Sequence, residues 1–431
     1  MTETTRDIDE LAHEIVAPTP RRDPFSALRI GDFRLLLAGR FLATLGEQML
    51  GVAIGWELYL RTHSALALGF VGLAEVVPII TLSLPAGYVA DRFNRKQVVM
   101  YAQVLGAAGA LGLALLSAAH GALLLFYLCL LFIGASDAFT SAASSSLVPQ
   151  TVPPEAFENA ATWSSSSWQL AAVLGPALGG LVIALCGGAA TLVYGLDLLA
   201  IILYLVLLLI MRANRPVALT QETPSLRSMA AGIGFIRQTP IILAAITLDL
   251  FAVLLGGATT LLPIFATAIL HVGPTGLGVL RAAPSIGAVC MAITLAFRRP
   301  FQRAGRTLLV AVAGFGVATI IFGFSRNFWL SLVMLVTLGA LDNISVVIRS
   351  TLLLLRTPDV LRGRISAVNN IFIGASNQLG GFESGVTAAL LGPVVSVGLG
   401  GVGTLVVVGA VAIIWPQMRR LGTLRPDITA P

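Results

Sequence analysis

The chain has 431 residues, of which 56% are hydrophobic and only 11% are charged. A soluble domain carries about 25% charged and about 45–50% apolar residues, and the mean hydropathy of +0.89 departs from that composition in the same direction. An intrinsically disordered chain, a secreted disulfide scaffold and a nucleic-acid-binding domain are therefore excluded as descriptions of the whole. The composition predicts a polytopic membrane protein, because a water-soluble fold cannot bury so much apolar surface.

Residues 1–32 are polar and lack the apolar core of a secretory signal, so we expect a cytosolic N-terminal tail. Hydropathy then predicts six helices in 33–211, a cytosolic linker over 212–239 with a short amphipathic helix at Ser225–Arg237, six more helices in 240–416 and a cytosolic tail over 417–431. The twelve predicted spans are 33–60, 66–90, 97–118, 123–147, 159–185, 189–211, 240–270, 274–297, 307–325, 328–355, 365–391 and 394–416.

The basic residues set the orientation. The net charge is +6, but the Lys and Arg residues are scattered in short clusters between apolar runs, which does not indicate nucleic-acid binding. With a cytosolic N-terminus, 22 of the 27 fall in cytosolic segments, and only Arg61 and Arg326 fall outside. Because cytosolic loops are enriched in Lys and Arg, both termini are predicted to be cytosolic.

The two sets of six helices read as copies. Three motifs recur at offsets of 204 to 206 residues: Gly134-Ala135-x-Asp137 as Gly339-Ala340-x-Asp342, then Gly72, Glu75 and Pro78 as Gly278, Arg281 and Pro284, and Pro154-Glu155 as Pro358-Asp359. Because six is an even number, both copies have the same orientation. The pattern predicts an all-α fold of twelve transmembrane helices, arranged as two parallel six-helix pseudo-repeats around a central cavity.

The loop between the second and third predicted helices combines a glycine, an acid and three bases. Gly87 allows helices to approach closely, and Asp91 is expected to cap a neighbouring helix and to pair with Arg92 or Arg95. Its pattern G-x-x-x-D-R-x-x-R-K resembles the signature loop of the major facilitator superfamily, with Asn94 where the family usually has Gly. The resemblance implies a gating loop, which locks the cytosolic side and releases as the halves rock, formed by Gly87, Asp91, Arg92, Arg95 and Lys96. The alternative is topogenic charge alone.

The fifth predicted helix contains Gly175-Pro176-Ala177-Leu178-Gly179-Gly180. It resembles the G-P-x-x-G-G motif of superfamily exporters, which implies export through Gly175, Pro176, Gly179 and Gly180; packing of small residues without directional meaning is the alternative. Over nearly its whole length the chain resembles the branch of bacterial twelve-helix exporters typified by the enterobactin exporter, including the segments 261–266 and 357–364. Drug:proton antiporters of the superfamily usually carry an arginine in the fourth helix, whereas this chain has Asp137 there.

Ionisable residues inside the predicted spans are functional candidates, because charge is costly within the hydrocarbon. The candidate proton or substrate cavity comprises Glu47, Glu75, Asp137, Asp249, Arg281, Asp342 and Arg349; Asp197 and Glu383 are further acids within spans. The family fold implies that Glu47, Asp137, Asp249 and Asp342 face the translocation path. Proton binding, substrate binding and structural ion pairing remain open for these acids.

Some charged and aromatic residues receive other interpretations. Glu75 and Arg281 are repeat-equivalent with opposite charge, but no contact is predicted between them, since helices 2 and 8 are not neighbours in the family fold. Glu57 is expected to snorkel to the interface. The pair Trp163 and Trp168 flanks four serines, which fits either an aromatic ligand or helix packing.

The leading hypothesis is a secondary active transporter that exports a small amphipathic molecule, such as a siderophore, antibiotic or drug, by alternating access coupled to protons. We expect a monomer in the bacterial inner membrane, with no nucleic-acid partner. The alternative is an importer or a lipid flippase on the same scaffold. Lys96, the only lysine, is followed by Gln97, so no P-loop exists, and the chain has no H-E-x-x-H motif. No enzyme activity, catalytic residue, cofactor or metal is therefore predicted.

Overall fold

The computed structural model describes residues 23–144, 147–212, 233–298 and 301–423. Its described part is built from twelve long helices joined by short turns. These helices are α2 (Gly31–Thr62), α3 (Ala65–Arg92), α4 (Arg95–Ala118), α5 (Leu123–Ser144), α7 (Phe157–Leu185), α8 (Thr191–Ile210), α10 (Pro240–Leu255), α12 (Gly273–Ala296), α13 (Ala304–Phe324), α14 (Phe328–Arg356), α15 (Asp359–Leu391) and α16 (Pro393–Ile414). The short elements are η1 (Ala27–Arg29), α6 (Val148–Thr151), η2 (Pro154–Ala156), η3 (Ala258–Leu261), α11 (Leu262–Ile264), η4 (Phe265–Ile269) and α17 (Pro416–Arg420).

Eleven of the described helical segments are long and apolar enough to cross a membrane. The twelfth long helix, α15, carries Asn369, Asn370, Asn377 and Gln378, which lower its hydropathy. The all-α prediction with twelve helices is confirmed, and among the uninterrupted spans the largest boundary error is at α15, which begins at Asp359 instead of residue 365. Of the amphipathic helix predicted over 225–237, only 233–237 lie within the described residues, and these are helical.

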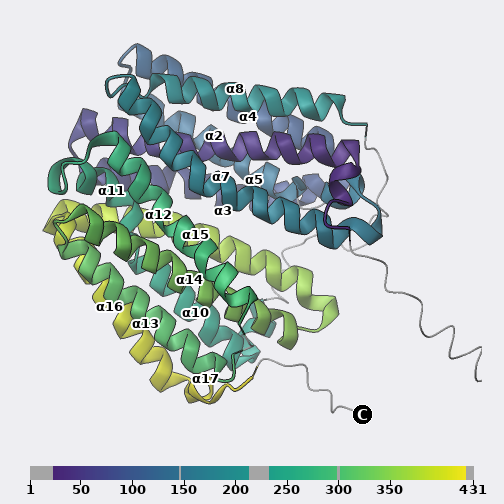
Figure 1. Ribbon diagram of the computed structural model, residues 1–431, viewed down its shortest axis with the longest axis vertical. Coiled ribbons are helices and arrows are strands. Elements are labelled where there is room, and N and C mark those ends of the chain that lie inside the picture. The colour runs from purple at the N-terminus through teal and green to yellow at the C-terminus, as the bar shows by residue number, and fades with distance from the viewer. Residues whose placement is uncertain (1–22, 145–146, 213–232, 299–300, 424–431) are drawn as a thin grey trace, which may run out of the picture.

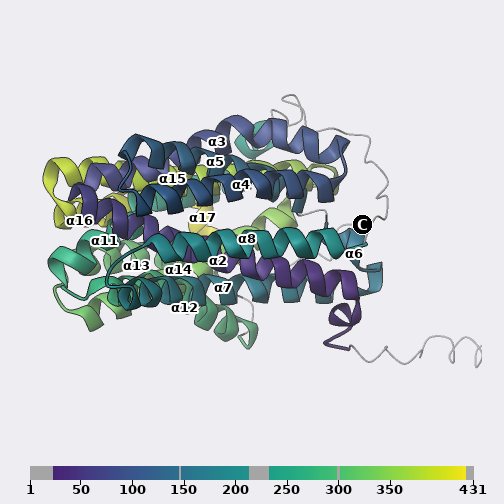
Figure 2. The ribbon, with the colours of Figure 1, turned by 90° about the horizontal axis from the view of Figure 1, so that it is seen from above.

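The helices form two groups of six. Helices α2 to α8 pack on one another, and helices α10 to α16 pack on one another. Figures 1 and 2 show the first group, in purple to teal, beside the second, in green to yellow. The groups meet mainly along two helix pairs, α3 with α15 and α7 with α12. In repeat terms α12 is the copy of α3, so each group contributes its second helix to the shared face.

Glycine contacts show the repeat in three dimensions. The backbone of Gly134 in α5 packs against Glu75 and Pro78 of α3, where an added Cβ would lie 3.1 Å from the Glu75 carbonyl oxygen. The equivalent Gly339 in α14 packs in the same way on the backbone of Pro284 in α12. The motifs that recur in the sequence therefore make the same helix contact in each group.

The two groups close on each other at one end only. We call the end that holds Asp23 and Thr423 the terminal end, and the opposite end, with the turns at His63 and Gly392, the far end. At the far end the backbones of Gly180 and Gly278 touch, as do those of Gly69 and Gly385. Toward the terminal end the two groups diverge (Figure 1). The structure is thus open toward the terminal end, which holds Asp23 and Thr423.

The seventh span is interrupted, which corrects the prediction of one continuous helix over 240–270. Helix α10 ends where the Gly256 amide bonds to the Ala252 carbonyl, and Gly257 follows with its backbone against Gly380 of α15. The chain continues through η3, α11 and the π-helical turn η4. Two successive glycines lower helix propensity, and the absence of side chains lets α15 approach the break.

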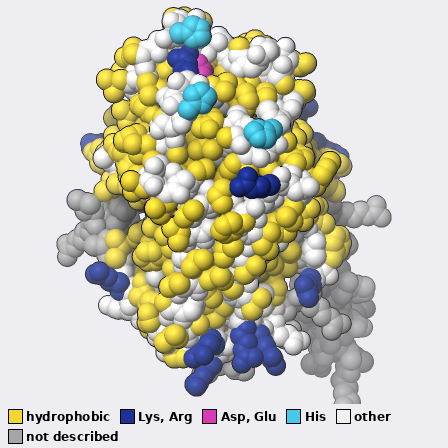
Figure 3. Space-filling model, turned by 90° about the vertical axis from the view of Figure 1, so that its left-hand side faces the viewer, with side chains coloured by type: hydrophobic (Ala, Val, Ile, Leu, Met, Phe, Trp, Pro, Cys, Tyr) yellow, Lys and Arg dark blue, Asp and Glu magenta, His cyan; other side chains and the backbone are white. Residues whose placement is uncertain are grey.

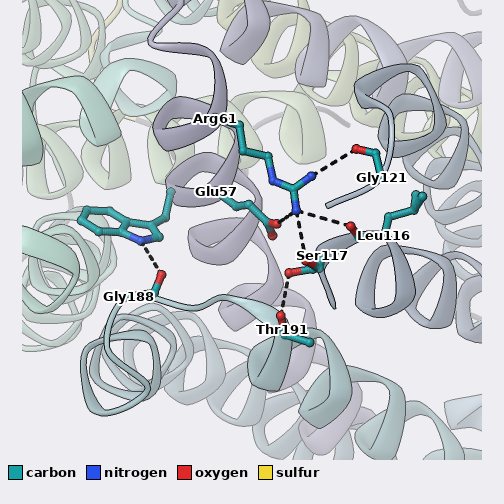
Figure 4. Close-up of polar contacts among 8 residues, drawn as sticks. Glu57, Arg61, Leu116, Ser117, Gly121, Gly188 and Thr191 are labelled. Atoms are coloured by element: carbon teal, nitrogen blue, oxygen red, sulfur yellow. Dashed lines mark hydrogen bonds and ion pairs between the residues drawn. The ribbon is translucent and has the colours of Figure 1, made fainter. Parts of the chain in front are cut away.

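A polar cluster fastens the far end of the first group (Figure 4). Arg61 forms an ion pair with Glu57 and donates hydrogen bonds to three carbonyls at the end of α4 and in the turn that follows, those of Leu116, Ser117 and Gly121, at 3.2 to 3.3 Å. Glu57 is only 8% exposed, so its interpretation as a snorkelling residue was wrong. The cluster ties α2 to the turn between α4 and α5.

We expect Arg61→Met to lower the free energy of unfolding by about 3–5 kcal/mol, because it leaves the Glu57 carboxylate buried without its partner. Thermal unfolding of the purified protein in detergent measures the change. Arg326→Met is the matched control, since Arg326 lies exposed at the same end. Equal unfolding temperatures for the two variants would contradict this assignment.

The far end is poor in charge. Figure 3 views it and shows mostly hydrophobic side chains with scattered histidines and few charged groups. Three turns there place His63, His120 and His271 at positive φ, between 47° and 53°. The basic residues at the ends of α3, α14 and α17 lie instead at the terminal end.

Candidate functional site

Four carboxylates from four helices gather inside the first group. Glu47 of α2, Glu75 of α3 and Asp197 of α8 all lie within electrostatic range of Asp137 in α5. Glu47 also acts on Glu75 and on Asp197. The structure therefore brings together three predicted cavity residues, Glu47, Glu75 and Asp137, and adds Asp197. The signal for Asp197 was its charge in the middle of an apolar span.

The four acids differ in how far they are exposed. Glu47 is exposed although it lies deep along α2 and has the acids of three other helices around it. Glu75 and Asp137 are partly exposed, whereas Asp197 is 3% exposed. Glu47, Glu75 and Asp137 are therefore the accessible members of this cluster, and Asp197 is its buried member.

The second group supplies the neighbouring cation. Nη1 of Arg281, in α12, donates a 2.8 Å hydrogen bond to the carbonyl of Gly51 in α2. The Arg281 charge also acts on Glu75, and one turn away on the same helix Gly72 packs on the backbone of Gln378 in α15. The two repeat-equivalent residues, for which no contact was predicted, are thus electrostatic neighbours across the interface. Glu75 of α3 therefore lies beside the interface, close to residues of both α12 and α15.

The second group holds a different arrangement. Asp249 of α10 forms a buried ion pair with Arg349 of α14, and their side chains are 10% and 3% exposed. In this state Asp249 therefore does not face the open space. Asp342 lines a small cavity together with Asp249, Ser345 and Phe315. Arg349, seven residues after Asp342 on the same helix, takes Asp249 of α10 as its partner.

The predicted gating loop forms contacts mainly within the first group. Asp91 pairs with Arg95 at 3.8 Å, and Arg92 bonds to the hydroxyl of Tyr88. The helix cap expected from Asp91 is made by Asn94, whose side chain accepts from the amides of Lys96 and Gln97 at the start of α4. Asn94 lies directly before α4, in the position from which a short polar side chain reaches those amides.

Lys96 connects the loop to α8. Its Nζ donates to the carbonyl of Met211 at 2.7 Å, just after the end of that helix. Gly87 lies in the last turns of α3.

The glycines of the fifth span serve two different contacts. Gly175 and Gly179 of α7 pack on the backbone of α2 within the first group. Gly180 packs on Pro274 and Gly278 of α12 across the interface, and the Pro176 carbonyl faces Gly278 from the other side. The motif therefore forms one far-end contact between the groups, and Gly69 forms another with Gly385.

The two tryptophans at the start of α7 do not line this site together. The indole of Trp163 donates to the carbonyl of Pro24 at 3.0 Å and lies against the ring of Phe25, at the terminal end. Trp168 is 54% exposed. In the described part of the chain, no group of three His, Cys, Asp or Glu is arranged to hold a metal ion.

Known proteins share this architecture. The family model described as transmembrane secretion effector matches residues 22–425. The enterobactin exporters EntS of Escherichia coli O1:K1 / APEC and of Shigella boydii serotype 18 are each 27% identical over 400 residues, which is 92% of this chain and 95% of the relative.

Solved structures resemble the fold at low sequence identity. The nucleoside transporter NupG has a TM-score of 0.68 at 13% identity and covers 90% of this chain and 99% of its own. A bacterial homologue of the human lysosomal transporter Spinster, inward-facing and unoccupied, has a TM-score of 0.70 at 14% identity and covers 90% and 96%.

A bundle of two six-helix repeats with ionisable groups at their interface is the architecture of a multi-pass membrane transporter of the major facilitator superfamily. Within that superfamily, the chain belongs to the transmembrane secretion effector family. Its substrate is a small molecule.

Proposed function

We propose that the protein exports a small amphipathic molecule of the siderophore class from the bacterial cytoplasm, as a proton-coupled monomer. The relatives named enterobactin exporter, which align over 92% of the chain, support export and this substrate class. The family description as a secretion effector supports the same direction. The glycine-proline motif of α7, which packs across the interface, fits an exporter closure.

The orientation follows from the charge pattern. In the sequence, 22 of the basic residues fall in the predicted cytosolic segments, and only Arg61 and Arg326 fall in turns on the opposite side, which the structure places at the far end. Because basic residues accumulate on the cytosolic side, we place both termini in the cytosol. The structure then corresponds to a state open to the cytosol, from which an exporter loads its substrate.

The observation that supports the mechanism is the position of Arg281, which crosses the interface to bond to the Gly51 carbonyl of α2 and lies within electrostatic range of Glu75. In the state closed at the far end, attraction between the two charges favours contact between the groups. The empty carrier with an ionised Glu75 is held in this state. A substrate that engages Arg281, or a proton that neutralises Glu75, weakens the attraction and permits the groups to rock. An empty, unprotonated carrier would therefore change slowly between its two states. Coupled antiport requires this, because an empty carrier that changed state freely would let the proton gradient dissipate without transport.

The test is transport in proteoliposomes with an imposed pH gradient, with enterobactin and a panel of cationic dyes as probes. We expect gradient-driven movement toward the far-end side for the wild type. For Glu75→Gln we expect accumulation to fall to the level of empty liposomes, because the variant cannot exchange a proton at this position. The exposed Glu155→Gln is the matched control, since it removes the same charge outside the bundle.

The direction of movement also separates the proposal from its alternatives. Accumulation toward the terminal-end side would indicate an importer. Movement of labelled phospholipid, with no movement of the probes, would indicate a flippase. Full gradient-driven transport by Glu75→Gln would contradict the coupling role of Glu75 and leave export intact.

A further inference from the structure

A groove lies outside the transport site, between α4 and α8. It has a volume of about 460 Å³ and lies at the terminal end of these helices. Figure 1 shows α4 and α8 on the side of the first group that faces away from the second group. A molecule in this groove cannot reach the space between the groups, so the groove is not part of the translocation path.

The walls of the groove are apolar and face outward. Tyr101 and Val104 of α4 are 76% and 56% exposed, and Leu209 of α8 is 62% exposed. Both helices are membrane-spanning segments. Side chains of this kind, exposed on a membrane helix, contact lipid chains, because no other apolar solvent is present there.

The rim of the groove is cationic and lies at the helix ends. Lys96 and Arg212 line it together with Gln97. The Lys96 ammonium donates to the carbonyl of Met211, the residue directly before Arg212, so the two cations lie on the same part of the rim. Asp32 is the nearby acid, and it accepts a 3.0 Å hydrogen bond from the Arg212 amide. Two cations and one carboxylate leave the rim with a net positive charge.

We infer that this groove binds an anionic phospholipid, with its phosphate at Lys96 and Arg212 and an acyl chain along Tyr101, Val104 and Leu209. Basic pockets between transmembrane helices at the membrane surface bind anionic headgroups. A zwitterionic phospholipid adds an ammonium group that would face the same two cations, so it fits the rim less well. Free phosphate lacks the chain that the apolar walls require.

The test is native mass spectrometry of the full-length protein in detergent. The probes are phosphatidylglycerol, phosphatidylcholine with the same acyl chains, and glycerol phosphate. We expect retained adducts with phosphatidylglycerol, and about thirtyfold weaker retention for the double variant Lys96→Gln/Arg212→Gln, which lacks both rim cations. Arg326→Gln/Arg356→Gln removes the same charge elsewhere and should retain phosphatidylglycerol like the wild type.

A second variant tests the groove without altering its charges. Val104→Trp fills the apolar wall and leaves Lys96 and Arg212 in place, so phosphatidylglycerol retention should fall again. This variant also decides the question if the double variant does not fold. Equal retention of phosphatidylglycerol and phosphatidylcholine, binding of glycerol phosphate as strong as that of the lipid, or unchanged retention in Val104→Trp would each overturn the inference.

Discussion

Replacing Gly180 with leucine should abolish transport while leaving the protein inserted and helical. In the far-end closure the backbone of Gly180 lies against Gly278, and an added Cβ would be 2.8 Å from the Gly278 Cα and closer still to the Pro274 carbonyl. Both neighbours are backbone atoms, which cannot rotate away as a side chain can. A leucine at this position therefore prevents α7 and α12 from closing, and the cycle stops with the far end open.

Transport assays measure the predicted loss of activity, and cysteine labelling measures whether the far end stays open. In a cysteine-free background, Pro263→Cys places a thiol at a buried position that contacts Gly55 across the interface. A membrane-impermeant maleimide applied from the far-end side should label it in the Gly180→Leu protein and not in the parent.

Gly195→Leu is the control, because nothing lies within 4 Å of its added Cβ. Gly180→Ala adds a single methyl group and should show an intermediate loss. Normal transport by Gly180→Leu would mean that this closure is not part of the cycle.

Hydropathy and repetition predicted most of the fold. Apolar runs locate spanning helices because the bilayer requires each segment to satisfy its own backbone hydrogen bonds, and the recurring motifs around Gly134 and Gly339 identified the two copies. The interruption of the seventh span was missed. The signal was present in Gly256-Gly257, but glycines are common in membrane helices, and the break depends on the approach of Gly380 from α15.

The candidate site could be predicted only in part. Charge within the spans identified Glu47, Glu75 and Asp137, since ionisable groups are rare there. The meeting of Glu75 with Arg281 depends on how the two groups are rotated against each other, which no pattern within one helix encodes. The partner of Arg349 likewise depends on the packing of α10 on α14, which gives it Asp249 and which no spacing along one helix encodes.

The second large effect is expected at that buried ion pair. Removing either partner alone should lower the free energy of unfolding by about 3–5 kcal/mol, because the remaining charge stays buried without compensation. The two losses should differ. Arg349 cannot give up its proton in a protein, so Asp249→Asn leaves a permanent buried cation. Arg349→Met leaves a carboxylate, which can bind a proton and become neutral. We therefore expect Asp249→Asn to be the more destabilised variant.

The double variant Asp249→Asn/Arg349→Met distinguishes the energy of the interaction from the separate effects of the two side chains. It removes both charges, so its stability should return most of the way to that of the wild type, as is seen when buried ion pairs are replaced together. Unfolding in detergent, followed for all four proteins, gives the coupling energy directly. Arg356→Met, an exposed change at the end of the same helix, should have little effect. Additive losses in the double variant would mean that the two side chains act independently, and the pair would then not be what joins α10 to α14.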